Sequence, residues 1–406
     1  MRYFLYMAVI ISALLLLEPL GFCQSPRGST KPAPSMAPTK PTFEALMNAA
    51  RQAFAQNKLQ DAASVLRQAS QLYPDQLPPH ELLASVDLQL KNYAEAESEA
   101  QKAITLAENQ PAPYELLAEA LSGQQKYTAA TQALQKAIAL EPSDASLWLR
   151  LGDTYVQSKN YHEAAQAYLD ALGLSPDSLQ AHAALGDVYE QLNEYDRAVL
   201  EYDAALHLLA QSPIANTPPG QQVRQQIQMG LANALAGAGR YQQAEMLAKQ
   251  LVEQYPKNAD VLATLAEVYD TAGKHTQAIE TYQKALALNP KEAILWGNLG
   301  WAQYNAGEYE AAIASSEKAL QLDKTLAYVQ FNLGLIYAVK GDWGSAKRAY
   351  DAGLAVASRT DITSALSDIY HAMSRDPKSS VLRRAYTYLE DAYFRTFSSE
   401  SNLIGS

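Results

Sequence analysis

The stretch Ala145–Ser178, ASLWLRLGDTYVQSKNYHEAAQAYLDALGLSPDS, sets the pattern of the whole chain. Its aromatic residue Tyr161 and its alanine Ala164 both recur every 34 residues, in two runs. The aromatic position holds Tyr93, Tyr127, Tyr161 and Tyr195, then Tyr241, His275, Tyr309 and Trp343. The alanine position holds Ala62, Ala96, Ala130, Ala164 and Ala198, then Ala244, Ala278, Ala312 and Ala346. A fixed period of this length predicts an array of structural repeats.

Nine repeat units follow from this spacing. They are 43–76, 77–110, 111–144, 145–178 and 179–212, then 225–258, 259–292, 293–326 and 327–360. The two runs, 43–212 and 225–360, are out of phase by 12 residues, which predicts a Pro-rich insertion at 213–224. A repeat array can grow beyond the usual size of one core, because each unit packs only on its neighbours.

The unit resembles the tetratricopeptide repeat (TPR). In 145–178 all eight signature positions match: Trp148, Leu151, Gly152, Tyr155, Ala164, Tyr168, Ala171 and Pro176. The resemblance implies an all-α fold, a right-handed superhelical α-solenoid of helix hairpins. Gly152 and Ala164 must be small where the two helices of a unit approach, since a larger side chain would overpack the crossing. Pro176 prevents the second helix from continuing.

The amino-terminal segment 1–23 is predicted to be a signal peptide. Arg2 precedes an apolar run that is too short to span a bilayer comfortably, and Gly21 and Cys23 fit a cleavage site before Gln24. Two alternatives remain: an uncleaved anchor, or lipidation of Cys23, although Phe22 departs from the lipobox pattern. Residues 24–42 are rich in proline, serine and threonine and predict a disordered tether.

Beyond the repeats, residues 361–396 predict two helices that cap the array. Leu366, Ile369, Tyr370 and Met373 form one apolar stripe, and Val381, Ala385, Leu389 and Ala392 form another. Asp376-Pro377 is interpreted as the start of the second helix. A terminal repeat exposes an apolar face that needs such a cover. Residues 397–406 are expected to be a flexible tail.

Composition and motifs argue against nucleic-acid binding and catalysis. The formal net charge of −11 disfavours a phosphate-backbone partner. The chain contains no P-loop, dinucleotide fingerprint, Gly-X-Ser-X-Gly or His-Glu-X-X-His motif, so we predict no catalytic residues, no cofactor and no enzyme. Its single cysteine and scattered histidines predict no metal site. Two of the histidines, His80 and His182, occupy the position of Trp148 and are interpreted as packing substitutes.

The resemblance implies that the first helices of the units line a concave groove. Inward positions along these helices carry carboxylates: Glu115, Glu119, Asp153, Asp187, Glu190, Glu267 and Asp270. This acidic surface would attract a basic segment of a partner and repel the acidic terminus that TPR carboxylate clamps hold. The alternative is an ordinary solvated face.

The last two repeats carry an aromatic patch at the inward positions. It comprises Trp301, Tyr304, Tyr328, Phe331 and Leu335. Such a patch commonly anchors an interface, but the alternative is that the cap covers it. Asn298 and Asn332 lie one repeat apart and resemble the asparagine ladders that bind a peptide backbone in some TPR proteins.

These observations predict an interaction scaffold in the cell envelope, periplasmic or extracellular, which binds a protein or peptide with basic and apolar segments in its groove. Membrane contact would occur only through an uncleaved or lipidated amino terminus. One alternative is a structural subunit of an export or assembly complex that binds through its second helices. A carbohydrate-acting wall protein is the least favoured alternative.

Overall fold

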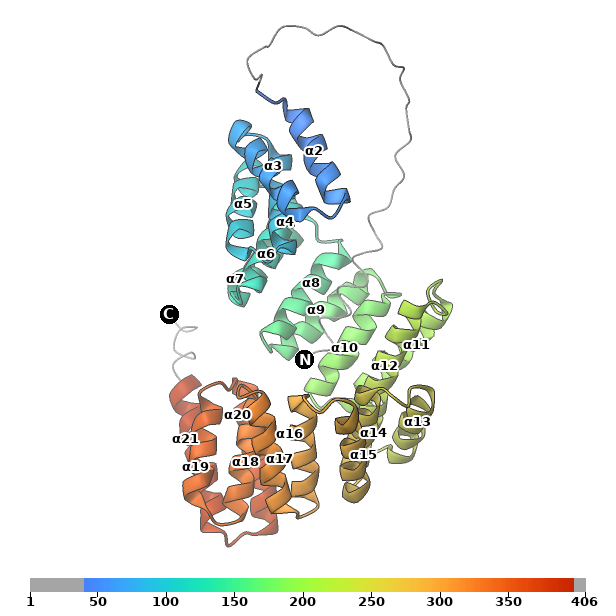
Figure 1. Ribbon diagram of the computed structural model, residues 1–406, viewed down its shortest axis with the longest axis vertical. Helices are drawn as coiled ribbons and strands as arrows, with labels where there is room; N and C mark the ends of the chain where they lie inside the picture. The colour runs from blue at the N-terminus through green and yellow to red at the C-terminus, as the bar shows by residue number, and fades with distance from the viewer. Residues whose placement is uncertain (1–39, 398–406) are drawn as a thin grey trace. The chain divides into compact units, whose positions relative to one another are not determined.

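A computed structural model of the chain describes residues 40–397, which form α-helices joined by short turns (Figure 1). The predicted all-α solenoid of helix hairpins is therefore confirmed. The predicted signal with Cys23, most of the tether and the tail at 398–406 lie outside the described residues. The chain forms two compact units. Unit 1 extends to Glu194 and includes Ala204–Val223, and unit 2 comprises Tyr195–Asp203 and the chain from Arg224 onward.

Unit 1 is built from consecutive antiparallel hairpins. In the first four, a first helix of 13 residues is followed by a second helix of 14. Its helices are α2 (Phe43–Ala55), α3 (Leu59–Leu72), α4 (Leu77–Gln89), α5 (Tyr93–Leu106), α6 (Pro111–Gly123), α7 (Tyr127–Leu140), α8 (Ala145–Gln157), α9 (Tyr161–Leu174) and α10 (Leu179–Gln191). Two further helices, α11 (Tyr195–Gln211) and α12 (Pro218–Gly237), contribute to both units.

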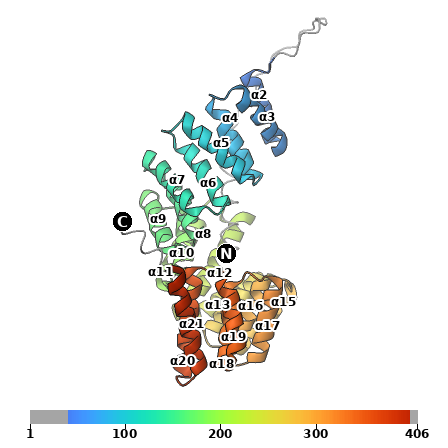
Figure 2. The same cartoon turned by 90° about the vertical axis from the view of Figure 1, so that its left-hand side faces the viewer.

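Unit 2 continues the hairpin pattern and ends in two longer helices. Its helices are α13 (Tyr241–Gln254), α14 (Ala259–Thr271), α15 (His275–Leu288), α16 (Ala293–Asn305), α17 (Tyr309–Leu322), α18 (Ala327–Val339), α19 (Trp343–Leu354), α20 (Arg359–Arg375) and α21 (Ser380–Phe397). Figure 2 shows α20 and α21 beside α18 and α19, and α18 contacts both of them.

The structure changes three details of the sequence-based boundaries. The segment predicted as an insertion is partly helical, because α12 begins at Pro218 and Thr217 Oγ1 accepts a hydrogen bond from the Gly220 amide. The first cap helix begins at Arg359, where Ser358 and Asp361 form a reciprocal capping box. Asp376 ends α20 rather than starting α21.

In several hairpins, a small residue on the first helix receives a large side chain of the second, as Gly152 does with Tyr168 and Gly334 with Tyr350. In the α8–α9 hairpin, a Cβ added to Gly152 would stand 2.4 Å from Cε1 of Tyr168. Tyr168 and Ala164 have no exposed surface, so this crossing is fully packed. The glycine therefore lets the tyrosine ring lie against the α8 backbone, and the same contact recurs between Gly334 of α18 and Tyr350 of α19.

A second recurring contact explains why histidine, tyrosine and tryptophan replace one another at one position. The polar atom of the ring lies close to the carbonyl oxygen six residues earlier. The pairs are His80 with Pro74 (3.1 Å), Tyr114 with Glu108 (3.1 Å), Trp148 with Pro142 (3.4 Å), His182 with Pro176 (3.0 Å) and Trp296 with Pro290 (2.9 Å). A carbonyl oxygen can only accept, so each ring is the donor. Each contact ties the start of a first helix to the turn before it.

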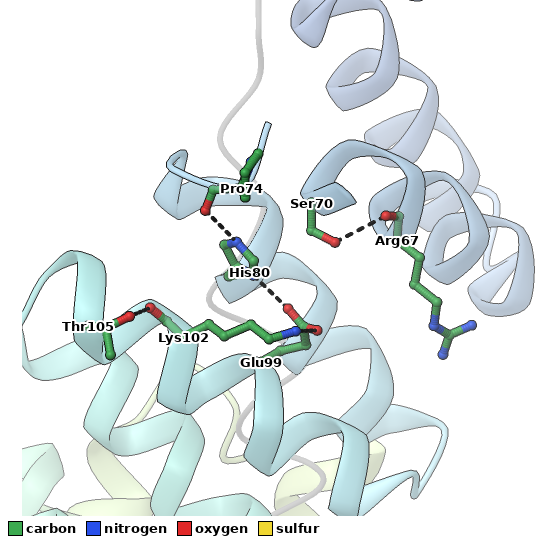
Figure 3. Close-up of polar contacts among 7 residues, drawn as sticks. All are labelled: Arg67, Ser70, Pro74, His80, Glu99, Lys102 and Thr105. Atoms are coloured by element: carbon green, nitrogen blue, oxygen red, sulfur yellow. Dashed lines mark hydrogen bonds and ion pairs between the residues drawn. The ribbon is translucent and has the colours of Figure 1, made fainter. Parts of the chain in front are cut away.

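His80 is the most buried of these rings, with 3% of its surface exposed. Its other nitrogen, Nδ1, lies 2.6 Å from Oε2 of Glu99 on α5, and the same carboxylate accepts a hydrogen bond from Lys102 at 2.8 Å (Figure 3). The histidine thus joins the two helices of its hairpin. This is the packing role predicted for it.

In the repeat units, the turn between the two helices of a hairpin contains a residue with positive φ. In unit 1 non-glycine residues adopt it, for example Gln125 at φ 62°, whereas the corresponding turns of unit 2 use glycine, for example Gly273 at φ 74°. Glycine adopts this left-handed conformation without the steric cost that other residues bear. The turns of unit 2 are therefore the less strained set.

Candidate functional site

The first helices of unit 1 carry a hollow that gathers predicted groove residues. Its volume is about 340 Å³. Glu115 and Glu119 of α6 line it together with Glu81 of α4, and Arg150 reaches it from α8. The remaining lining residues are Pro78, Leu82, Ser85, Ala112 and Leu116. The hollow is therefore amphipathic, with carboxylates beside apolar side chains on consecutive first helices.

Arg150 forms loose ion pairs with two of these carboxylates. Its Nε lies 3.3 Å from Oε2 of Glu115, and its Nη1 lies 3.6 Å from Oε2 of Glu119. Charge-assisted hydrogen bonds between nitrogen and carboxylate oxygen usually measure about 2.7–2.9 Å. About half of the Arg150 side chain (49%) is exposed, so solvent screens both pairs.

Glu81 differs from its neighbours because it forms no ion pair within residues 40–397. Burial alone raises the pKa of Glu81 above its ordinary value. Burial also raises the pKa of Glu115, and the positive charge of Arg150 counteracts part of that shift. Both carboxylates are thus partly desolvated, which disfavours their charged forms. A cation placed in the hollow would stabilise those charged forms.

The other acidic positions of unit 1 are not equivalent to this pair. Asp153 accepts a hydrogen bond of 2.6 Å from the Tyr168 hydroxyl, so it links α8 to α9. Burial raises the pKa of Asp153, and that hydrogen bond opposes the rise. Asp187 and Glu190 are both partly exposed on α10. The predicted acidic surface therefore contains one carboxylate, Asp153, that is committed to packing.

In unit 2 the first helices hold a carboxylate between two amides. Glu267 on α14 accepts hydrogen bonds from Asn233 of α12 at 2.8 Å and from Asn298 of α16 at 3.0 Å. Burial raises the pKa of Glu267 to about 7, with Asp270 adding to the rise and both amides opposing it. Asn298 was predicted to hold a peptide backbone, but its amide group already donates to Glu267.

Asp270 is also engaged within the protein. Its Oδ1 lies 2.7 Å from His275 Nδ1, and its Oδ2 accepts a hydrogen bond of 2.9 Å from Asn305. Asn332, the second predicted ladder residue, is partly exposed on α18. Asn298 is also partly exposed, and its bond to Glu267 uses one of its two amide hydrogens. The asparagine ladder therefore stays a prediction.

The predicted aromatic patch is a core, which corrects its interpretation as an open anchor. Phe331 and Leu335 are 3% and 2% exposed, and Tyr304 is 8% exposed. They pack with Ile369 of α20 and Leu389 of α21 in one cluster. Trp301 is partly buried against that cluster, and Tyr328 is partly buried, with its hydroxyl enclosed. The cap helices α20 and α21, which both contact α18, contribute to the cluster that buries Tyr304, Phe331 and Leu335.

Sequence reasoning missed three residues of these two sites: Glu81, Arg150 and Asn233. Glu81 precedes Glu115 by one period, and Asn233 precedes Glu267 by one period. The repeat register itself could therefore have indicated both. Arg150 had no such signal, because its register position in the preceding repeat is the apolar Leu116.

The described residues offer neither a metal centre nor a membrane span. Within 40–397, no three His, Cys, Asp or Glu side chains are grouped as metal ligands would be. None of the helices in that range is both long and apolar enough to cross a bilayer.

Stacked helix hairpins with a short, fixed period define the class of helical-repeat solenoids. Three family models, each described as a tetratricopeptide repeat, match residues 44–75, then 116–178 and 149–213, then 235–299 and 271–315. The chain belongs to the tetratricopeptide-repeat family. The fold is that of interaction scaffolds, which are typically not enzymes.

Solved structures include similar folds at low identity. A tetratricopeptide repeat protein from Parabacteroides merdae is 18% identical, with 72% of this chain and 98% of that chain covered and a TM-score of 0.50. MamA from Desulfovibrio magneticus RS-1 is 18% identical over 42% of this chain and 97% of that chain, with a TM-score of 0.40. YrrB, described as a TPR protein with an unusual peptide-binding site, is 23% identical over 47% and 92%, with a TM-score of 0.38. A comparison with curated proteins found no match.

Proposed function

We propose that this protein is an exported scaffold that holds a polypeptide against the first-helix face of its repeats. The observation that carries the proposal is the amphipathic hollow of α4 and α6, in which apolar and carboxylate side chains lie side by side. One segment of a polypeptide can contact both kinds of surface: its apolar side chains pack on the apolar lining, and its basic side chains pair with the carboxylates.

The face that binds can be tested by site-specific photo-crosslinking in the producing cells. Leu82 lies in the hollow and is 37% exposed, and Leu169 on the second helix α9 is 36% exposed. A photoreactive residue at position 82 should form adducts with a polypeptide, whereas the same residue at position 169 should not. Adducts at position 169 alone would instead favour the alternative of a structural subunit that binds through its second helices.

Export is the second part of the proposal, and it depends on residues 1–23, which carry the features of a signal peptide. Mass spectrometry of the protein recovered from the cell envelope or medium tests it. We expect an amino terminus at Gln24. A terminus at Cys23 with an added lipid mass would indicate the lipidated alternative, and an intact Met1 would indicate the uncleaved anchor.

The proposal does not include catalysis. Glu267 has the pKa shift of a general acid, but both of its oxygens accept hydrogen bonds from asparagine amides. A catalytic carboxyl needs an oxygen that can reach a substrate. Glu267 is therefore better explained as a polar link between α12, α14 and α16.

A further inference from the structure

We infer that the hollow between α4 and α6 is a binding site for a long cationic side chain, lysine or arginine, of the bound polypeptide, and that Arg150 is an internal competitor for it. The inference rests on the proposed function, because it names the part of the polypeptide that this surface selects. It follows from the shape of the hollow, its charge and the way Arg150 occupies it.

The shape suits a side chain that is apolar along its stem and charged at its end. Pro78, Leu82 and Leu116 supply apolar lining. Lysine and arginine bury their methylene stems on such surfaces while the charged end stays near water or acidic groups. The hollow, about 340 Å³ in volume, is open to solvent and can admit a side chain of this length.

The charge of the hollow is unbalanced. Glu81, Glu115 and Glu119 face one cation, Arg150, so the lining carries a formal charge of −2 when all four groups are ionised. Glu81 gains nothing from Arg150, since burial is the one cause of its raised pKa. An incoming cation would therefore find one carboxylate that has no ion-pair partner within residues 40–397.

Arg150 behaves as a displaceable occupant. Its contacts with Glu115 and Glu119 are long, at 3.3 and 3.6 Å, and its side chain is about half exposed. Exposed pairs of this kind contribute little to stability, so the guanidinium can swing away at small cost. A cation from the partner, held additionally by the backbone and neighbours of its own chain, would replace it.

The test measures fluorescence anisotropy of the full chain with three labelled peptides of identical length, in which alternate positions hold lysine, arginine or glutamine among alanines. The lysine and arginine peptides should bind more tightly than the glutamine peptide. Replacing two carboxylates, Glu81→Gln with Glu115→Gln, should weaken lysine-peptide binding on the order of fivefold. The control Glu163→Gln changes an exposed carboxylate of the second helix α9 and should leave the affinity unchanged.

The decisive variant is Arg150→Ala, because it removes the competitor and should tighten lysine-peptide binding about two- to fivefold. Lys136→Ala removes the same charge from an exposed position on α7 and controls for the overall field. If Arg150→Ala tightens binding no more than Lys136→Ala, the competitor role is wrong. If the glutamine peptide binds as tightly as the lysine peptide, the inference of a cation site is wrong. Crosslinking at position 82 tests polypeptide binding independently of this result.

Discussion

At the scale of single residues, Glu267 shows how a first-helix surface can be acidic in sequence without being an open acidic surface. Its two oxygens accept hydrogen bonds from amides on neighbouring helices, and burial raises its pKa to about 7. Asn233 Oδ1 is enclosed without a hydrogen-bond partner within the described residues. When Glu267 is protonated, its hydroxyl can donate a hydrogen bond to Asn233 Oδ1 once the Asn233 amide has rotated.

The raised pKa of Glu267 predicts a pH-dependent stability. In the folded chain the Glu267 carboxyl keeps its proton up to about pH 7, whereas in the unfolded chain it loses the proton near its ordinary pKa of 4.5. The stability that this protonated carboxyl contributes is fully present below about pH 4.5. It is lost as the pH rises from there through about 7, by on the order of 3 kcal/mol. Glu267→Gln should remove this component of the pH dependence.

Urea unfolding at pH 5 and pH 8 measures the effect. The wild-type chain should lose more unfolding free energy between the two values than Glu267→Gln. The exposed Glu280→Gln on α15 is the matched control and should behave as the wild type does. Equal pH dependence in wild type and Glu267→Gln would mean that Glu267 is already ionised at pH 5.

Two glycines of the same hairpin predict opposite effects of one substitution. A Cβ at Gly152 would stand 2.4 Å from Tyr168, whereas a Cβ at Gly173 in α9 meets nothing within 4 Å. Gly152→Ala should therefore lower the free energy of unfolding by about 1–3 kcal/mol. Gly173→Ala should raise it by up to about 1 kcal/mol, because alanine is the better helix former. Thermal unfolding of both variants checks the pair, and a loss of stability in both would contradict the assigned geometry.

At the scale of elements, the cap helices α20 and α21 determine the character of the last repeats. The inward faces of α16 and α18 carry Tyr304, Phe331 and Leu335, and the cap turns these side chains into core. The cap therefore completes the solenoid end, as a terminal repeat requires.

This role predicts that Phe331 contributes to stability rather than to partner capture. Phe331→Ala should lower the free energy of unfolding by about 3–5 kcal/mol, since it leaves a cavity in a well-packed core. Tyr370→Ala removes a ring that is 63% exposed on α20 and should cost no more than about 0.5 kcal/mol. Chemical denaturation separates the two, and similar small costs would mean that Phe331 is not part of a well-packed core.

At the scale of the whole molecule, the net charge of −11 gives the chain a field that attracts basic partners. Association with the lysine peptide should slow by about tenfold or more when the ionic strength rises from 0.01 to 0.15 M, because the screening length falls from about 30 to 8 Å. Stopped-flow mixing measures the rate constants. The association rate constant of the glutamine peptide should change little with ionic strength. Equal salt dependence for both peptides would contradict electrostatic attraction of the lysine peptide.

The sequence by itself determined the hairpins and their stacking. The positions of Tyr161, Ala164 and Gly152 are filled by similar residues at a fixed spacing along the chain. Residues at these positions contact residues of the same hairpin or of a neighbouring one. A local rule of this kind can be read from spacing, because each helix must bury the same narrow stripe in every repeat.

Only the tertiary structure decided which inward positions remain available to a partner. Phe331 and Leu335 have the chemistry of an anchor, but they pack in a core with residues of α20 and α21. Asn298 has the chemistry of a peptide ligand, and one of its two amide hydrogens is bonded to Glu267. Arg150 reaches back across a repeat to Glu115. Spacing identifies which residues share a face, whereas exposure depends on which other elements and long side chains arrive there, and no periodic signal records that.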